Sequence, residues 1–482
     1  MLFNSYAFVL AFLPLAVLVY RGLRRFGLDR CSIAALTLLS LGFYGWWNPV
    51  YLLLLVPLML ANFALARLIV PRAARRPPGA RALLAIGLTG NLAVLAYFKY
   101  ANFLVDNFGV LTGLEFTLAK VVLPLGISFF TFQKIAFLVD AYRGRVDRLD
   151  LLDFSLFVTF FPQLIAGPIV HHSEVLPQFR QRGRVPAADT MMGLTIFVIG
   201  LAKKVLIADT AAAYVAPGFE AAAAGLRPDM LTAWSSALAY TAQLYFDFSG
   251  YSDMAVGAGL LFGIRLPINF ASPYKAASII DFWHRWHITL SRFLREYLYI
   301  PLGGNRRGPL RRHANIMITM LLGGLWHGAG WTFVIWGGLH GAYLIVNHAW
   351  RALRGGAPVR AWERLLGRLF TFLAVVVGWV FFRAADAASA VEMLRGMTGA
   401  NPSSATPGAA GTGLLIAGIL LGVAVLAPNT QEITGYVGPG DIRPSTQPRW
   451  QPDLRWAGAC GCLLGVCLLS LSRVSEFLYF QF

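Results

Sequence analysis

The sequence predicts an all-α protein that crosses a membrane many times. Apolar residues make up 57% of its 482 residues and charged residues only 13%, about half the share that soluble domains carry. The mean hydropathy is +0.61, and the apolar residues gather in stretches long enough for membrane-spanning helices. A chain with so little charge cannot cover a water-facing surface, which excludes soluble, disordered and fibrous classes of protein.

The spans follow from the apolar stretches, since a helix needs about 20 apolar residues to cross a bilayer. The stretches of suitable length are 3–20, 31–48, 50–70, 83–103, 121–140, 190–208, 232–262, 314–349, 366–383, 411–428 and 456–472. Of these, 314–349 is long enough for two passes, and 3–20 lacks the basic start and cleavage site of a signal peptide. The stretch 153–170 is also apolar, but Pro162, Gly167 and Pro168 predict a broken or re-entrant helix.

Basic residues between the stretches predict the orientation, because arginine and lysine gather in cytoplasmic loops. Arginines follow the first, third and fifth stretches and are frequent in 265–312 and 351–368. They are scarce in 209–231 and 384–410. We therefore expect the basic segments in the cytoplasm and both termini on the extracytoplasmic side.

The domain organisation is expected to be simple. No repeat or soluble appendage is visible, so we expect one integral-membrane domain over 1–482, with 473–482 as an extracytoplasmic tail. The net charge of +18 resides mainly in short clusters between apolar stretches. This pattern fits the lipid bilayer as a partner and, without a recognisable nucleic-acid motif, does not fit nucleic acid. The four cysteines contain no CxxC pair, so neither a disulfide framework nor a zinc site is expected.

The histidines are the first candidates for chemistry, because ionisable groups inside a membrane are costly to bury. His327 lies in Leu325-Trp-His-Gly328, about fifteen residues beyond Arg312 and therefore near mid-membrane depth. A desolvated imidazole is expected to be neutral and could take a proton from a hydroxyl group. A structural histidine held by a buried hydrogen bond is the alternative. Structural or interfacial roles are expected for the remaining candidates outside 281–300: His171, His172, His313, His340 and His348.

Two further segments combine charge with aromatic residues. From Asp281 to Ile300, apolar and charged residues alternate at helical spacing, which predicts an amphipathic helix at the inner face. Its arginines suit either an anionic, phosphate-bearing ligand or lipid phosphates. Asp247 and Asp253 lie within an apolar run and need partners if they are buried. These two carboxylates could orient an imidazole or an arginine, or form a purely structural network.

Six motifs occur in an order that resembles the membrane-bound O-acyltransferase family, and within it the bacterial alginate O-acetyltransferase branch. They are Gln163-Leu-Ile-Ala-Gly-Pro-Ile169, Tyr245-Phe-Asp-Phe-Ser-Gly-Tyr-Ser-Asp253, Arg285-Trp-His287, Tyr299-Ile-Pro-Leu-Gly-Gly-Asn-Arg306, Leu325-Trp-His-Gly328 and Phe477-Leu-Tyr-Phe-Gln-Phe482. The resemblance implies a ring of roughly 11 to 13 tilted transmembrane and re-entrant helices around a central tunnel. It also implies an O-acyltransferase that moves acetyl groups across the inner membrane to an extracytoplasmic polysaccharide.

The resemblance also implies substrates and partners. The donor would be acetyl-CoA or another acyl thioester on the cytoplasmic side, with no bound cofactor and no metal. A periplasmic acetyltransferase of the SGNH-hydrolase type would place the acetyl group on the polymer. Alginate is the first expectation for that polymer, and peptidoglycan, cellulose or another glycan are the alternatives. The terminal aromatic motif, which relatives acting on teichoic acid borrow from a separate small protein, favours the acetyl branch.

Residue roles follow from the same resemblance. The family's two marked histidines fall on His287 and His327, and Tyr479 is expected to carry the acyl group. His284 stands where relatives commonly have arginine, so it receives no role. The residues expected to bind or position donor or substrate are Asp247, Asp253, Asp281, Arg285, Arg295, Asn305 and Trp326.

Two other classes of protein stay open from the residues alone. The first is a membrane metalloenzyme with His284, His287 and His327 as ligands, since His284 and His287 are three residues apart and can share one helix face. The second is a transporter without covalent chemistry, because broken helices and arginines within membrane segments fit that class too.

Overall fold

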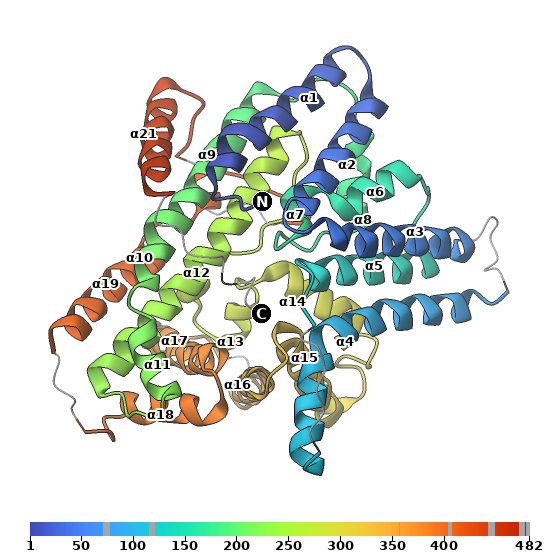
Figure 1. The fold of residues 1–482 in the computed structure, drawn as a ribbon. Coiled ribbons are helices and arrows are strands. Elements are labelled where there is room, and N and C mark those ends of the chain that lie inside the picture. Colours follow the sequence, from blue (N-terminus) through green and yellow to red (C-terminus); the bar gives the residue numbers. More distant parts are fainter. Residues whose placement is uncertain are drawn as a thin grey trace. The chain divides into compact units, whose positions relative to one another are not determined.

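The computed structural model contains helices and no strand in the part of the chain that it describes (Figure 1), which is residues 1–70, 78–114, 121–355, 357–402, 407–441, 449–471 and 478. Five of these helical segments are long and apolar enough to cross a membrane: Ala7–Arg25, Pro49–Ile69, Ala80–Thr112, Ala187–Ala212 and Ala361–Arg383. The predicted all-α, multi-pass fold class is thereby confirmed.

Contacts divide the chain into two compact units. The first comprises Met1–Leu201, Tyr251–Ile268 and Thr434–Leu471. Its helices are η1 (Ala7–Phe12), α1 (Leu13–Arg25), α2 (Asp29–Gly45), η2 (Pro49–Tyr51), α3 (Leu52–Ile69), α4 (Ala80–Thr112), α5 (Ile127–Tyr142), α6 (Leu151–Thr159), α7 (Phe161–Leu164), α8 (His172–Phe179), most of α9 (Ala187–Ala202) and α21 (Leu454–Ser470). Helices α3, α4 and α5 run side by side (Figure 1).

The second unit comprises Ala202–Gly250, Asn269–Ile433 and Ser472–Phe482. Its helices are η3 (Lys203–Ala208), α10 (Asp209–Ala212), α11 (Ala216–Ala223), η4 (Pro273–Lys275), α13 (Ile279–Trp283), α14 (Ile288–Leu294), η5 (Arg295–Tyr299), α15 (Gly308–His327), α16 (Trp331–Leu353), α17 (Ala361–Arg383), α18 (Ala387–Met397), α19 (Pro407–Leu426) and most of α20 (Thr430–Thr434). The long helix α12 (Met230–Leu261) contributes residues to both units.

The two places where the sequence predicts broken helices are broken in the structure. The stretch 153–170 contains α6 and α7, separated at Phe160. Pro162 has no N–H group to donate, so α6 cannot continue through it. The stretch 314–349 contains α15 and α16, separated by Gly328-Ala-Gly330.

Glycine sets how closely α15 and α16 pack. A Cβ atom at Gly324 would collide with the carbonyl oxygen of Phe333, and one at Gly328 would collide with the Phe333 ring. The glycine of the Trp-His-Gly motif therefore lets the chain turn back directly after His327. This places His327 as the last residue of α15, at the tip of a tight helical hairpin.

The segment from Asp281 to Ile300 differs from the expected amphipathic helix. Helix α13 ends at Trp283, α14 begins only at Ile288, and the π-helix η5 follows it. The break lies at His287, whose backbone is left-handed (φ 44°, ψ 52°) and cannot belong to a right-handed helix. Helical spacing alone could not reveal this break, because the apolar pattern continues through it.

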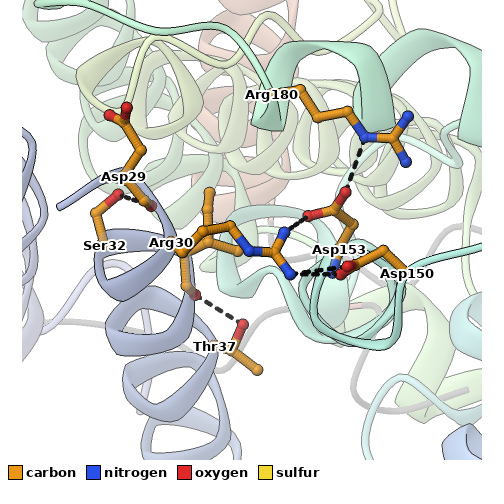
Figure 2. A network of polar contacts seen from close by, with 8 residues as sticks. Asp29, Arg30, Ser32, Thr37, Asp150, Asp153 and Arg180 are labelled. Carbon is orange, nitrogen blue, oxygen red and sulfur yellow. Dashed lines mark hydrogen bonds and ion pairs between the residues drawn. The ribbon is translucent and has the colours of Figure 1, made fainter. Parts of the chain in front are cut away.

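In the first unit, arginines and carboxylates join segments that lie far apart in the chain (Figure 2). Arg30 at the start of α2 contacts Asp150, at 2.8 Å, and Asp153, also at 2.8 Å. Arg180, which follows α8, donates to the other oxygen of Asp153 at 2.9 Å. Asp150 also caps α6 by accepting from the Asp153 backbone N–H. Burial favours the neutral form of Asp150, but the hydrogen bonds from Arg30 and the backbone leave its pKa below the ordinary value.

Candidate active site

His287 is fully buried in the turn between α13 and α14. Among the residues that the structure describes, only Ser272 and His287 have a positive φ without being glycine. An L-residue in this conformation costs about 1–2 kcal/mol relative to right-handed backbone. Such strain persists only where the surroundings impose it, and it often marks a functional position.

Asn269 imposes the conformation at His287. Its backbone carbonyl accepts from the Ile288 N–H at 3.0 Å. Its side-chain Oδ1 accepts from the Thr289 hydroxyl at 2.9 Å and lies 3.1 Å from His287 Nδ1. Because Oδ1 can only accept, Nδ1 carries the proton in this contact and Nε2 keeps its lone pair. We assign the tautomer of His287 on this basis.

His327 is also buried, with 5% of its surface exposed. Its ring lies edge-on to Trp336, with ring centroids 5.1 Å apart, and to Phe382 at 5.2 Å. Trp326 lies 4.8 Å from it on the same helix. These large rings exclude water from the imidazole, and the end of α15 fixes its position.

The two histidines face a shared aromatic environment. Their ring centroids are 6.3 Å apart, and Trp326 lies within 6.1 Å of His287 as well. Phe248 of α12 packs edge-on against His287 at 4.8 Å. Proton transfer to or from a hydroxyl group requires a ring nitrogen within about 3 Å of its oxygen, so a hydroxyl group bound between the two rings would be near both imidazoles.

Comparison with known protein sequences identifies the family of this chain. The model of the membrane-bound O-acyltransferase family matches residues 80–385, which include both histidines. The chain belongs to the membrane-bound O-acyltransferase family. It is therefore an acyltransferase that crosses the membrane several times, and the predicted family is confirmed.

Individual relatives place the acyltransferase in a bacterial branch. It is 43% identical to a probable alginate O-acetylase of Pseudomonas aeruginosa over the full length of both chains. It is 45% identical to a peptidoglycan O-acetyltransferase of Helicobacter pylori over 83% of this chain and 80% of the relative. A teichoic acid D-alanyltransferase of Streptococcus thermophilus is 26% identical over 54% of this chain and 68% of its own length.

The remaining predicted site residues of the acyltransferase have varied surroundings. Trp326 contacts both histidines. Asp281 accepts from Arg285 Nε at 2.7 Å, and Arg285 also donates to the Ala271 carbonyl at 3.2 Å. Arg285 thus ties the strained turn to the segment that carries Asn269. This pair supports the backbone of the site rather than presenting a free guanidinium to a ligand.

The other predicted residues lie in different environments. Arg295 and Asn305 are exposed, at the start of η5 and in the turn before α15. Asp247 and Asp253 are both buried in α12, and they belong to different units. Tyr479 lies outside the described residues.

The structure gives the metalloenzyme alternative no support. His284 is exposed, whereas His287 is fully buried, and α13 ends at Trp283, so the two histidines do not share a helix face. In the described part of the chain, no three His, Cys, Asp or Glu side chains form a group that could hold a metal ion.

Sequence reasoning missed Asn269 and Lys204. Asn269 stands alone among apolar neighbours, from Leu266 to Phe270, and this isolation was the available signal. Lys204 is 2% exposed and lies 2.7 Å from Asp247. It was hidden in Lys203-Lys204, which resembles an ordinary basic pair at the end of a span.

Proposed function

We propose that this acyltransferase moves acetyl groups from a thioester donor on the cytoplasmic side to the outer side of the bacterial inner membrane, for O-acetylation of a polysaccharide. The observation that carries the proposal is the buried pair of His287 and His327, 6.3 Å apart in aromatic surroundings. Alginate is the polymer that we propose, because a full-length relative bears that name. Peptidoglycan is the alternative, since a relative of similar identity acts on it by name.

The proposed chemistry is a direct acyl transfer. A nitrogen of His327 takes the proton of the attacking hydroxyl group as its oxygen bonds to the thioester carbonyl carbon. The carbon–sulfur bond then breaks, and the proton passes to the departing thiolate. One ester and one thiol result, and the imidazole returns to its neutral form.

His287 has a different proposed task. Because Nδ1 carries the proton that contacts Asn269, Nε2 is the ring nitrogen that would accept from a hydroxyl group of the substrate. A hydroxyl group held between the two rings would be oriented by His287 and deprotonated by His327. Holding both reactants in one geometry is worth up to about 7–11 kcal/mol of the activation barrier.

Tyr479 is the proposed first acceptor. A phenol is more acidic than a serine hydroxyl, so the resulting acyl-tyrosine is a better donor for a further transfer. A periplasmic partner of the SGNH-hydrolase type would take the acetyl group onto its serine and then place it on the polymer. In this scheme acetyl-CoA is the donor that we propose to test first.

The test uses the full-length protein in proteoliposomes with acetyl-CoA labelled in the acetyl group, without the outer partner. We expect labelled acetyl on the C-terminal peptide at Tyr479, and its loss in Tyr479→Phe. Tyr97→Phe, at an exposed tyrosine of α4, is the matched control. A Tyr479→Phe protein that still acetylates polymer with the partner present would exclude the tyrosine relay. Failure to label any acceptor covalently would contradict acetyl-CoA as the donor.

The proposed direction of transfer depends on the sides that the arginines predict. In a cysteine-free background, a cysteine at Ala224, which is exposed after α11, should react with an impermeant thiol reagent from outside. A cysteine at Arg306, also exposed, should react only after the membrane is opened. The reverse pattern would invert both the topology and the direction of acyl flow.

A further inference from the structure

Leu478, the residue of the C-terminal tail that the structure describes, makes a polar contact that the proposed function does not use. The backbone N–H of Leu478 donates to Asp247 Oδ2 at 3.1 Å. Asp247 lies near the middle of α12, and the two residues are 231 positions apart in the chain. Leu478 and Asp247 are 5% and 1% exposed. Leu478 is therefore buried against this helix.

Asp247 is part of a buried ionic cluster. Lys204 Nζ lies 2.7 Å from Asp247 Oδ1 and 2.8 Å from Asp209 Oδ1. The side chains of Lys204, Asp209 and Asp247 are between 1% and 7% exposed. Two carboxylates thus share one ammonium group, and burying such charges is stable only when hydrogen bonds offset their loss of hydration. The Leu478 N–H supplies one such bond to Asp247.

The local backbone explains how Lys204 reaches both carboxylates. Lys204 lies in the π-helix η3, which joins α9 to α10. Backbone hydrogen bonds in a π-helix link residues five positions apart, and Lys204 and Asp209 have this spacing. The wide turn therefore brings the ammonium and the Asp209 carboxylate to one side, toward Asp247. π-helical turns of this kind frequently occur at functional sites.

We propose that Asp247, held by Lys204 and Asp209, is the docking residue for the chain's own C-terminal tail. The bond is made by a backbone amide, so it fixes the register of the tail and is independent of the side chain at position 478. Asp247 is then a positioning residue, because the hydrogen bond lies one residue before Tyr479. The consequence for acyl transfer rests on the proposed role of Tyr479, but the docking itself does not.

The test distinguishes the hydrogen bond of the Leu478 backbone N–H from the packing of the Leu478 side chain. Leu478→Pro removes the N–H donor, whereas Leu478→Ala keeps it and shortens the side chain. Both variants of the full-length protein, in detergent and without acyl donor, are digested with a carboxypeptidase, and the release of residues 480–482, which do not adjoin the introduced proline, is followed by intact mass. We expect Leu478→Pro to be trimmed about tenfold or more faster than the wild type, because a hydrogen bond to a charged acceptor is lost. Leu478→Ala should stay much closer to the wild type.

Asp247→Asn gives a second measurement that leaves the tail sequence intact. The amide keeps an acceptor oxygen but loses the negative charge that Lys204 and the Leu478 N–H both contact. We expect trimming intermediate between wild type and Leu478→Pro. If Leu478→Pro were trimmed at the same rate as the wild type, the docking proposal would be overturned. Equal, fast trimming of Leu478→Ala would also overturn it, since the leucine side chain would then hold the tail.

Failure of the docking proposal is distinguishable from failure of the proposed function. Tail protection is measured in the absence of acyl donor, so it reports docking alone. Fast trimming of Leu478→Pro together with an active Tyr479→Phe protein would establish docking and exclude the tyrosine relay. If Tyr479 carries labelled acetyl and Leu478→Pro is trimmed at the wild-type rate, the relay is established and docking through Asp247 is excluded.

Discussion

Each unit of the protein contains a pair of histidines, and the two pairs have opposite surroundings. In the first unit, the Nδ1 atoms of His171 and His172 lie 3.9 and 3.6 Å from the buried carboxylate of Asp140. Arg143 and Arg145 contact the same carboxylate at 3.7 and 3.3 Å. In the second unit, by contrast, the rings near His287 and His327 are aromatic, and His287 contacts the neutral amide of Asn269.

The difference indicates which pair suits proton transfer. A carboxylate stabilises a cationic partner, so the Asp140 cluster can hold segments together through charge. An amide oxygen fixes the tautomer of His287 and stabilises an imidazolium less than a carboxylate does, and the aromatic rings exclude water, so His287 and His327 are suited to proton transfer. Proximity of two histidines is thus insufficient evidence for catalysis, and their partners discriminate between the pairs.

The largest expected effect is the loss of acetyl transfer when the proposed base His327 is removed. His327→Ala should lower polymer acetylation by about 10²–10⁴-fold, the usual loss when a positioned base is removed. His172→Ala, from the other pair, should change the rate of the correctly folded protein by less than about twofold. The measurement is acetyl transfer per mole of purified, monodisperse protein. Similar losses in both variants would remove the distinction between the two pairs.

The second prediction concerns His287 and its near neighbour His284. His287→Ala should lower the rate severely, about 10²-fold or more, because it removes the ring that orients the hydroxyl group. His284→Ala should retain most of the activity, because its side chain is exposed while that of His287 is buried. Initial rates at saturating donor, with melting temperatures as a check on folding, test this order. An equally severe loss at His284 would contradict our choice between the two.

The third prediction replaces the amide that contacts His287 by a carboxylate. Asn269→Asp places a carboxylate beside His287 Nδ1, which imitates the arrangement of Asp140 in the other unit. The carboxylate should stabilise the imidazolium, so the acidic limb of the pH–rate profile should move to higher pH. Asn269→Leu removes the acceptor and should lower the rate without this move. An unchanged profile in Asn269→Asp would mean that His287 does not act in its neutral form.

The smallest effect concerns the ionic contacts of the first unit, with Asp150 as the test residue. Its pKa is lowered in the folded protein, so its contribution to stability is present at neutral pH and is lost as the pH falls below about 4. Asp150→Asn should lower the melting temperature by only about 1–3 °C at pH 7, since 39% of the Asp150 side chain and 58% of the Arg30 side chain are exposed and water screens the pair. The difference from the wild type should vanish in acid. Acetylation rates should not change.

Much of the fold could be predicted because helix-forming membrane segments carry a strong one-dimensional signal. Each apolar stretch of suitable length contains a helix, and prolines and glycines predicted the breaks within 153–170 and 314–349. The break at His287 could not be predicted in this way. It depends on Asn269, eighteen positions earlier, and such a contact leaves no trace in the apolar pattern.

The candidate site was predictable to a similar degree. His287, His327 and Trp326 were chosen from motifs, and the structure brings these three together. Arg295 and Asn305 were chosen from the same kind of signal, yet both are exposed. A motif identifies a residue type in a local sequence, whereas burial and partners are set by distant segments. For the same reason the paired partner of Asp247, Lys204, emerged only from the structure.

The left-handed backbone of His287 also limits how this position can vary. Glycine and, to a lesser extent, asparagine tolerate such a backbone, and β-branched residues do not. His287→Gly would relieve about 1–2 kcal/mol of local strain, but it would also leave a cavity in place of a fully buried ring, which costs about 2–5 kcal/mol. The packing of the ring therefore outweighs the strain of its backbone. Neither a glycine, which loses the ring, nor a β-branched residue, which clashes with the backbone, can replace histidine here without loss of stability.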